Sequence, residues 1–224
     1  MVKETKMDYS GYINELRQHS IVQIPCDSFD DEALIDIASN IGCVITGSRG
    51  ELVQRLPARE KGEGPVGSFS YVVGYGRFPW HVDTAYWNIP THYLLLASDS
   101  PSSCATLYQD FLYIKSKIHD FEYLAKRAVF LLNVPGKKRY LSPLFEVNGR
   151  IGFRMDFHVY LAANAEAELL QEKVMEILEH DYRRHVWTGK EVVVMDNWRM
   201  IHAREDASDD TNRILKRIYI NELV

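Results

Sequence analysis

Two short clusters of polar side chains in the sequence could hold a metal ion. His81 and Asp83 are separated by one residue, and His202 lies in a second cluster much further along the chain. Residues i and i+2 of an extended strand point to the same face, so His81 and Asp83 could converge on one ion while Val82 faces the other way. Two imidazoles and one carboxylate on one side of a metal form the facial triad of non-haem iron(II) oxygenases, which leaves positions open for a keto acid and O₂.

The His-x-Asp pair says little by itself. The chain has 8 His and 15 Asp in 224 residues, so such a pair arises by chance about 0.5 times. The alternative interpretation is a hydrogen bond between a histidine and an aspartate on the surface. Asp156 and His158 form a second pair with the same spacing, but no later residues supply it with a set of partner ligands.

Two arginines near the end of the sequence could bind a carboxylate. The segment from Arg213 to Ile220 alternates as a strand, which places Arg213, Leu215, Arg217 and Tyr219 on one face. A guanidinium holds a carboxylate through paired, charge-assisted hydrogen bonds, so an inward arginine beside a metal suits the distal carboxylate of a dicarboxylic cosubstrate. The alternative is an edge strand on which both arginines are solvated.

Several stretches together resemble the Fe(II)/2-oxoglutarate-dependent dioxygenases of the taurine dioxygenase (TauD/TfdA) type. The matching stretches are Trp80-His-Val-Asp83, Ser102-Ser-Cys-Ala-Thr106, Val194 to Arg204, Asn212 to Arg217 and, as an opening helix, Phe29 to Gly42. The resemblance spans most of the chain. It departs from the family in lacking the usual glycines before Thr106 and in a compact stretch between the two ligand clusters, which predicts a reduced lid over the substrate.

The resemblance assigns roles to individual residues. It implies that Fe(II) is bound by His81, Asp83 and His202. It also implies that Arg213 and the hydroxyl of Thr106 hold the distal carboxylate of 2-oxoglutarate, and that Arg217 lies beside the cosubstrate and the substrate. A related halogenating class has a small residue in place of the carboxylate ligand, so the presence of Asp83 disfavours halogenation.

The expected activity is oxidation of an unactivated C–H bond, with hydroxylation as the default, coupled to O₂ consumption and decarboxylation of 2-oxoglutarate to succinate and CO₂. Two other classes of function remain open at this point. A zinc-dependent hydrolase could use the same His/Asp/His set, since zinc also accepts three protein ligands and one water. A non-catalytic, cupin-like protein could bind a small ligand without turnover.

The substrate site is predicted from Trp80, Tyr86 and Arg217. A cationic anchor beside apolar walls suits a small anionic molecule with a hydrocarbon portion, such as an amino acid or an intermediate of specialised metabolism. The alternative is that Arg217 only supports the cosubstrate or an internal carboxylate. Tyr86 and Trp87 are adjacent in the sequence and face opposite sides, so only one of them can line a cavity.

The elements that must position these residues are mostly short strands. Asp30 can cap a helix whose apolar stripe ends at Gly42, and a second helix is predicted from about Asn164 to His180. Residues 51–67 are rich in charge and glycine and predict a mobile loop. Strands are predicted at residues 20–24, 68–73, 92–97, 129–134, 151–154 and 189–195. This pattern favours a mainly β fold with flanking helices, a double-stranded β-helix (distorted, cupin-like jelly roll) whose open mouth takes a metal site.

The composition is that of an ordinary globular enzyme. The 224 residues are 46% hydrophobic and 25% charged, which predicts a single domain over 1–224. A net charge of −5 argues against binding nucleic acid through its phosphates. The three cysteines have no paired spacing, which favours buried thiols in a reducing compartment. No stretch approaches a membrane span or a leader, so the expected location is cytoplasmic, with a small-molecule substrate and no membrane partner.

Overall fold

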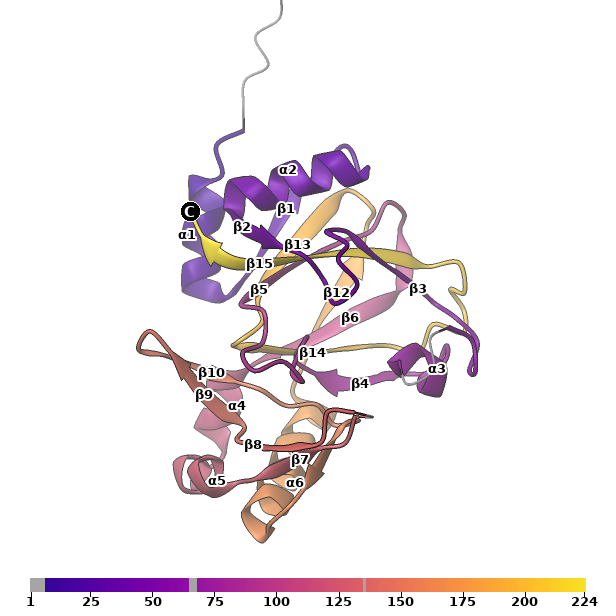
Figure 1. Ribbon diagram of the computed structural model, residues 1–224. Helices are drawn as coiled ribbons and strands as arrows, with labels where there is room; N and C mark the ends of the chain where they lie inside the picture. The colour runs from indigo at the N-terminus through magenta and orange to yellow at the C-terminus, as the bar shows by residue number, and fades with distance from the viewer. Residues whose placement is uncertain (1–6, 65–67, 135) are drawn as a thin grey trace, which may run out of the picture.

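Two antiparallel sheets lie face to face in the middle of the molecule (Figure 1). The computed structural model describes residues 7–64, 68–134 and 136–224. The larger sheet has the order β1-β13-β5-β15-β2, with β3 also paired to β15. Its strands are β1 Ile21–Pro25, β2 Gly42–Ile45, β3 Gln54–Pro57, β5 Tyr93–Ala97, β13 Glu191–Asp196 and β15 Ile214–Leu223. The smaller sheet has the order β12-β6-β14-β4, from β4 Phe78–His81, β6 Ser102–Asp110, β12 Arg183–Trp187 and β14 Met200–Arg204.

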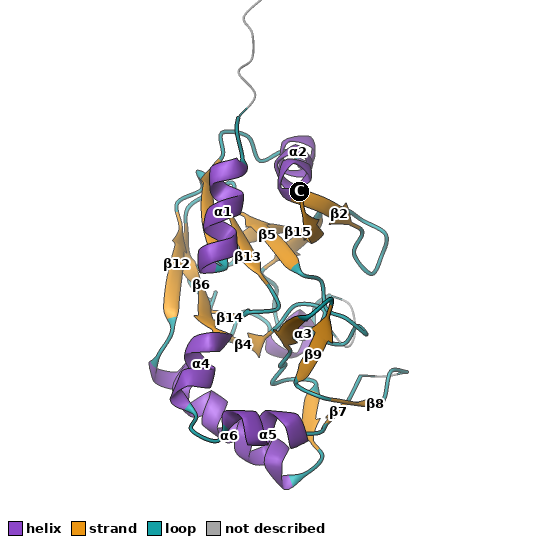
Figure 2. Cartoon of the chain, turned by 90° about the vertical axis from the view of Figure 1, so that its left-hand side faces the viewer, coloured by secondary structure: helices purple, strands orange, loops and turns teal. Residues whose placement is uncertain are grey.

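Two N-terminal helices cover the outer face of the larger sheet (Figure 2). They are α1 Ser10–His19 and α2 Asp31–Ile41. The Asp30 side chain accepts a hydrogen bond from the Ala33 amide at 2.8 Å, so it caps α2 as predicted. The buried stripe of Leu34, Ile37 and Ile41 then packs against the sheet, because these residues recur at the period of a helix.

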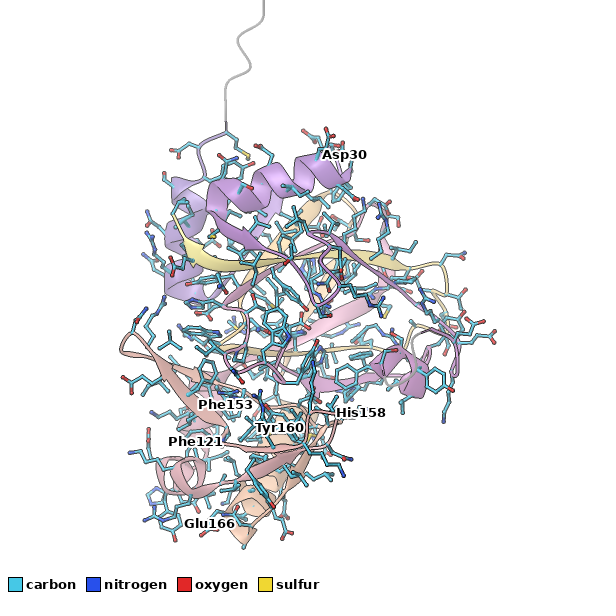
Figure 3. The ribbon with its side chains drawn as sticks, viewed as in Figure 1. Asp30, Phe121, Phe153, His158, Tyr160 and Glu166 are labelled. Carbon is cyan, nitrogen blue, oxygen red and sulfur yellow. The ribbon has the colours of Figure 1, made fainter. Side chains whose placement is uncertain are left out.

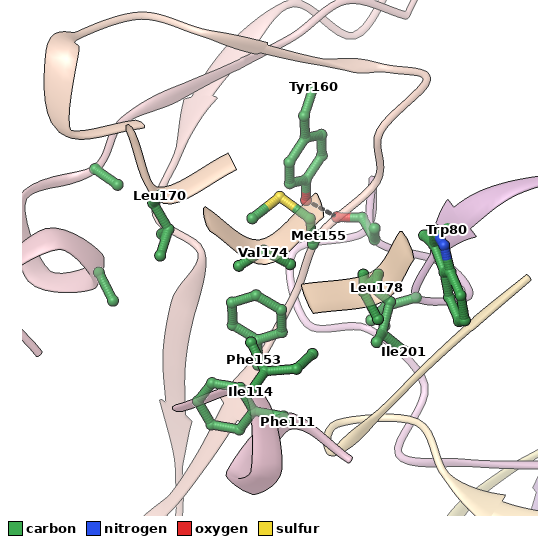
Figure 4. Packing of buried hydrophobic residues seen from close by; sticks show 14 of the residues in the cluster. Trp80, Phe111, Ile114, Phe153, Met155, Tyr160, Leu170, Val174, Leu178 and Ile201 are labelled. Atoms are coloured by element: carbon green, nitrogen blue, oxygen red, sulfur yellow. Dashed lines mark hydrogen bonds between the residues drawn. The ribbon is translucent and has the colours of Figure 1, made fainter. Parts of the chain in front are cut away.

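A second group of elements covers the outer face of the smaller sheet. It contains α4 Phe111–Lys117, α5 Phe121–Arg127, α6 Ala165–His180, and the strands β7 Phe130–Leu132, β8 Arg139–Leu141 and β11 Tyr160–Ala162. Asn164 caps α6 through a bond from the Ala167 amide, so the predicted second helix is confirmed. Figure 4 shows the core beneath this sheet, where the hydroxyl of Tyr160 donates to the carbonyl of Ala85 at 2.8 Å. The hairpin β9 Leu144–Val147 and β10 Arg150–Phe153 completes this side.

Two local predictions are wrong. Residues 68–73 form a short helix, α3 Phe69–Val73, in place of a strand. Ser68 caps this helix at the Tyr71 amide, and Gly74 follows it with φ 63°, so a cap and a stop decide a conformation that a short apolar run leaves ambiguous. The stretch 51–67, predicted as a loop, contains the strand β3. This strand forms because β15 offers an edge for pairing, and Leu56 of β3 lies opposite Leu215 of β15. Residues 65–67 of that stretch lie outside the described residues.

The helices and the cysteines bear on the environment that the sequence predicted for the chain. Among the described residues, no helix has the length and apolar character needed to cross a membrane. Cys26 and Cys104 carry buried free thiols, as predicted. Cys43 is exposed, so the prediction that all three cysteines are buried is wrong.

Candidate metal centre and cosubstrate pocket

Antiparallel pairing of two strands brings the two histidines together. His81 at the end of β4 lies directly opposite His202 on β14, and the two ring centroids are 4.4 Å apart. Both rings line the space between the sheets, whereas the neighbouring Ile201 packs into the core on the other side. The alternation of side chains along a strand produces this division.

Asp83 joins the histidines from a turn. The strand β4 ends at His81, so the expectation of a strand continuing through Asp83 is wrong in detail. The turn is fixed by Asn197, whose Oδ1 accepts from the Asp83 amide at 2.9 Å and whose Nδ2 donates to the Asp83 carbonyl at 3.0 Å. The sequence did not reveal this role of Asn197. The one signal there is that Asn197 is a polar residue directly after a buried strand. It aims the Asp83 side chain at the histidines.

The three side chains present a set of atoms that suits a metal. His81 Nε2 lies 3.8 Å from Asp83 Oδ1, and His202 Nε2 lies 4.0 Å from Asp83 Oδ2. Within the described ranges they form the one group of three or more possible ligands, with all ligand atoms within 4.8 Å of one another. His81 Nδ1 donates to the carbonyl of Pro79 at 2.9 Å, which leaves the Nε2 lone pair of a neutral ring for a metal.

Two further observations fit a bound divalent cation. Asp83 Oδ2 is buried and has no hydrogen-bond partner among the described residues, so a cation would compensate it. Burial by itself would raise the pKa of Asp83, but the charges of Arg217, His202 and His81 bring it below its usual value. Burial, with the neighbouring His81, lowers the pKa of His202 to about 3, so this ring is neutral and able to coordinate at neutral pH.

A pocket of about 720 Å³ opens from the metal centre between the two sheets. Arg213, just before β15, and Thr106 on β6 both line it. Arg213 is 5% exposed, its Nε has no partner within the described chain, and burial lowers its pKa. Thr106 Oγ1 accepts a hydrogen bond from Trp187 Nε1 at 3.0 Å, so its own hydrogen is free for an anion. Trp187, which the sequence reasoning missed, thus orients a predicted cosubstrate residue.

Arg217 is bound to an internal carboxylate. It shares the inward face of β15 with Leu215 and Tyr219, as predicted. Its Nη1 donates to Asp83 Oδ1 at 2.6 Å, and its Nε and Nη2 donate to Gln54 Oε1 at 3.2 and 2.5 Å. A guanidinium has five N–H groups, so these three bonds leave part of its donor capacity for a ligand.

Tyr86 and Trp80, the two aromatic residues predicted to contact the substrate, lie in different parts of the structure. Tyr86 lines the pocket, whereas Trp87 packs against Tyr219 with ring centroids 6.0 Å apart. Trp80 is 3% exposed and lies in the core beneath the smaller sheet, near Tyr182. We therefore correct the expectation for Trp80, because alternation along β4 turns it away from the pocket that its neighbour His81 faces.

The second carboxylate/imidazole pair does not form a metal group in the described structure. Asp156 faces His81 through an isolated β-bridge and lines the pocket, and its Oδ1 accepts from the amides of His158 and Val159 at 2.9 and 3.2 Å. His158, labelled in Figure 3, packs edge-on against Phe69 with centroids 4.9 Å apart. The two side chains are therefore engaged separately.

Comparison with known proteins gives one family match and several structural likenesses. The sequence model of the taurine catabolism dioxygenase TauD, TfdA family matches residues 109–219. None of the curated proteins matches the chain. An asparagine oxygenase in complex with Fe(II), 2S,3S-3-hydroxyasparagine and succinate superposes with a TM-score of 0.72 at 14% identity, covering 94% of this chain and 78% of that chain. The two chains therefore share a fold.

Two further solved structures are similar. PvcB from Pseudomonas aeruginosa has a TM-score of 0.75 at 17% identity, covering 97% of this chain and 81% of that chain. The non-haem iron oxygenase OrfP, in complex with Fe, succinate and (3S)-hydroxy-L-Arg, has a TM-score of 0.69 at 16% identity, covering 95% and 81%. With the family match and the His/Asp/His geometry, these likenesses favour an oxygenase over a hydrolase or a binding protein. The chain therefore shares the fold of these iron oxygenases, and it is similar to the TauD, TfdA family over residues 109–219.

Proposed function

We propose that the protein hydroxylates a C–H bond of a small metabolite of the amino acid type, while 2-oxoglutarate is decarboxylated to succinate and CO₂. The observation that carries this proposal is the pocket that contains both the His81/Asp83/His202 group and the buried guanidinium of Arg213, whose Nε has no hydrogen-bond partner among the described residues. We also propose that the two facing sheets form a double-stranded β-helix, a distorted jelly roll, and that residues 1–224 act as one oxygenase domain.

In this proposal His81, Asp83 and His202 hold Fe(II). The iron, when bound, activates O₂ for oxidation of the substrate. Arg217 fixes Asp83 Oδ1 at 2.6 Å, which leaves Oδ2 toward the metal. The His202 ring remains neutral and needs no deprotonation before it coordinates.

The cosubstrate would extend from the metal to Arg213. The distal carboxylate of 2-oxoglutarate would pair with the Arg213 guanidinium and accept the hydroxyl hydrogen of Thr106. Leu96 and Leu215 line the same part of the pocket and exclude water from it, which strengthens the charged contact. Trp187 holds the Thr106 oxygen in place.

The substrate class is supported by the rest of the pocket. Its volume of about 720 Å³ suits a cosubstrate and a small metabolite together. Phe69, Phe78 and Tyr86 supply apolar walls for a hydrocarbon portion. The asparagine oxygenase and OrfP structures hold hydroxylated amino acids, which supports the same class here. The acidic net charge of −5 disfavours a nucleic acid substrate.

The test is iron-dependent formation of succinate from 2-oxoglutarate, measured with a panel of amino acids and related small metabolites. We expect one class of compound to stimulate succinate release and O₂ consumption with Fe(II) and not with Zn(II). Activity with Zn(II) and without O₂ would contradict the proposal and favour a hydrolase.

The metal ligands are tested by alanine variants. We expect His81→Ala, Asp83→Ala and His202→Ala to lose stoichiometric binding of Fe(II), because each removes one of three ligands. His158→Ala is the matched control, since His158 belongs to the second His/Asp pair and should leave the stoichiometry unchanged. Near-normal turnover in Asp83→Ala would refute the ligand assignment.

A further inference from the structure

The residue that follows the proposed metal ligand Asp83 has an unusual backbone conformation. Thr84 has φ 55°, in the left-handed region, and its side chain branches at Cβ. A branched residue is strained there, whereas glycine adopts this region freely. Two other described residues that are not glycine have a positive φ: Ser20, which ends α1, and Asn148, in the turn between β9 and β10. Helix ends and hairpin turns commonly hold this conformation, but Thr84 is 4% exposed and lies beside the metal centre.

The Thr84 hydroxyl bridges the two ends of the loop between β4 and β5. Its Oγ1 donates to the carbonyl of Asp83 at 2.7 Å and accepts from the amide of Thr91 at 2.8 Å. Asn197 binds the same two residues, because its Nδ2 donates to the carbonyls of Asp83 and Thr91 at 3.0 and 2.8 Å. Two side chains therefore close this loop at its base.

The left-handed residue reverses the chain directly after Asp83. The Trp87 amide donates to the Thr84 carbonyl at 2.7 Å, so a tight turn follows the end of β4. A threonine in the extended region would continue the strand past Asp83 and carry the hydroxyl away from Thr91. Because the direction of a side chain follows its backbone, this turn decides where the Asp83 carboxylate points.

The Thr84 hydroxyl has no hydrogen left for a ligand. Thr84 lines the pocket, but its one O–H hydrogen goes to the carbonyl of Asp83. The Asp83 carboxylate is held by Arg217 at Oδ1, while Oδ2 has no hydrogen-bond partner among the described residues. The orientation of Oδ2 therefore depends on the backbone of Asp83, which Thr84 helps to fix.

We propose, resting on the function proposed above, that Thr84 is a positioning residue of the metal centre. Its hydroxyl bridge and its left-handed backbone hold the Asp83 carboxylate toward His81 and His202. Strained conformations persist where the surrounding structure over-determines them, and they cluster at functional sites. Glycine would accept the same turn without strain, but it could not tie Asp83 to Thr91.

The test measures the Fe(II) affinity of the protein without O₂ and without 2-oxoglutarate, by competition with a coloured chelator. Thr84→Val keeps the shape and removes the hydroxyl, and Thr84→Gly removes both the hydroxyl and the strain. We expect both variants to bind Fe(II) about 10- to 100-fold more weakly, as for the loss of a group that orients a metal ligand. Thr84→Ser keeps the hydroxyl and should bind Fe(II) within about threefold of the wild type.

Asn148→Gly is the matched control. It relaxes another left-handed residue, which is exposed and lies outside the pocket lining, so its Fe(II) affinity should equal that of the wild type. Urea unfolding of the metal-free proteins separates positioning from simple stabilisation. A residue that only stabilises the fold would lower the unfolding midpoint when replaced and leave the Fe(II) affinity of the folded protein unchanged.

Wild-type affinity in Thr84→Gly or Thr84→Val, or an equal loss in Thr84→Ser, would overturn the proposal. Thermal melting checks that each variant folds, and Thr84→Gly decides the outcome if Thr84→Val does not fold. The metal centre itself is judged separately, by Fe(II) binding in the wild type and its loss in Asp83→Ala. Binding that is lost in Asp83→Ala and normal in the Thr84 variants would refute the role of Thr84 alone.

Discussion

Replacing Arg213 by glutamine distinguishes two roles of a buried arginine. Arg213 is 5% exposed, and its Nε has no hydrogen-bond partner among the described residues. The guanidinium therefore stays in the protein at a desolvation cost that the charge of Asp210 offsets only in part, because burial still lowers its pKa. We expect Arg213→Gln to keep or raise the free energy of unfolding measured without 2-oxoglutarate. An arginine in a buried structural ion pair would behave oppositely, with a loss of about 3–5 kcal/mol on removal.

The same change should weaken cosubstrate binding strongly. Deleting one partner of a desolvated charge pair costs about 2–5 kcal/mol. Because about 1.4 kcal/mol corresponds to a factor of ten, the dissociation constant of 2-oxoglutarate should rise roughly 30-fold to several thousand-fold. The stabilisation that 2-oxoglutarate gives to the protein in thermal melts should fall in parallel.

The assay is calorimetric titration of 2-oxoglutarate into the Fe(II)-loaded protein without O₂, with urea unfolding of the ligand-free protein beside it. Lys126→Gln is the control, because Lys126 lies outside the pocket lining and its pair with Glu122 joins side chains that are 69% and 53% exposed, so the change should affect neither measurement. Affinity within threefold of the wild type in Arg213→Gln, or a marked loss of stability without ligand, would refute the assignment of Arg213 to the cosubstrate.

Three further variants test the support around the site. Trp187→Phe keeps the buried ring and removes the donor to Thr106, so calorimetry should show 2-oxoglutarate bound about 3- to 10-fold more weakly, with the affinity for Fe(II) unchanged. Asn197→Ala frees the backbone of Asp83 and should lower the affinity for Fe(II) by about 10- to 100-fold in metal titrations; unchanged affinity would show that the turn holds without it. Burial lowers the pKa of His185 below its ordinary 6.5, so the unfolded chain binds more protons in acid and stability falls as the pH drops through 6.5. His185→Gln should reduce that fall by at most about 1.4 kcal/mol per pH unit, measured by urea unfolding at about pH 7.5 and 5.5.

The sequence by itself determined the features that depend on short-range periodicity. The cap at Asp30 and the apolar stripe behind it predicted α2, and the strict alternation after Arg213 predicted which side chains of β15 face inward. The types and spacing of His81, Asp83 and His202 indicated the metal chemistry. The predictions for α2 and β15 held because i+3/i+4 neighbours of a helix and i+2 neighbours of a strand share a face, whereas Asp83 reaches the histidines from a turn.

Only the tertiary structure decided how the site is held. The bonds from Asn197 to Asp83, from Trp187 to Thr106 and from Arg217 to Gln54 join residues 114, 81 and 163 positions apart. The strand β3 likewise forms because β15 offers an edge with which it can pair. Trp80 lies in the core and not at the predicted substrate site, because the register of β4 directs its side chain into the core. Such contacts depend on which strands pair and in which register, and local sequence spacing carries no information about either.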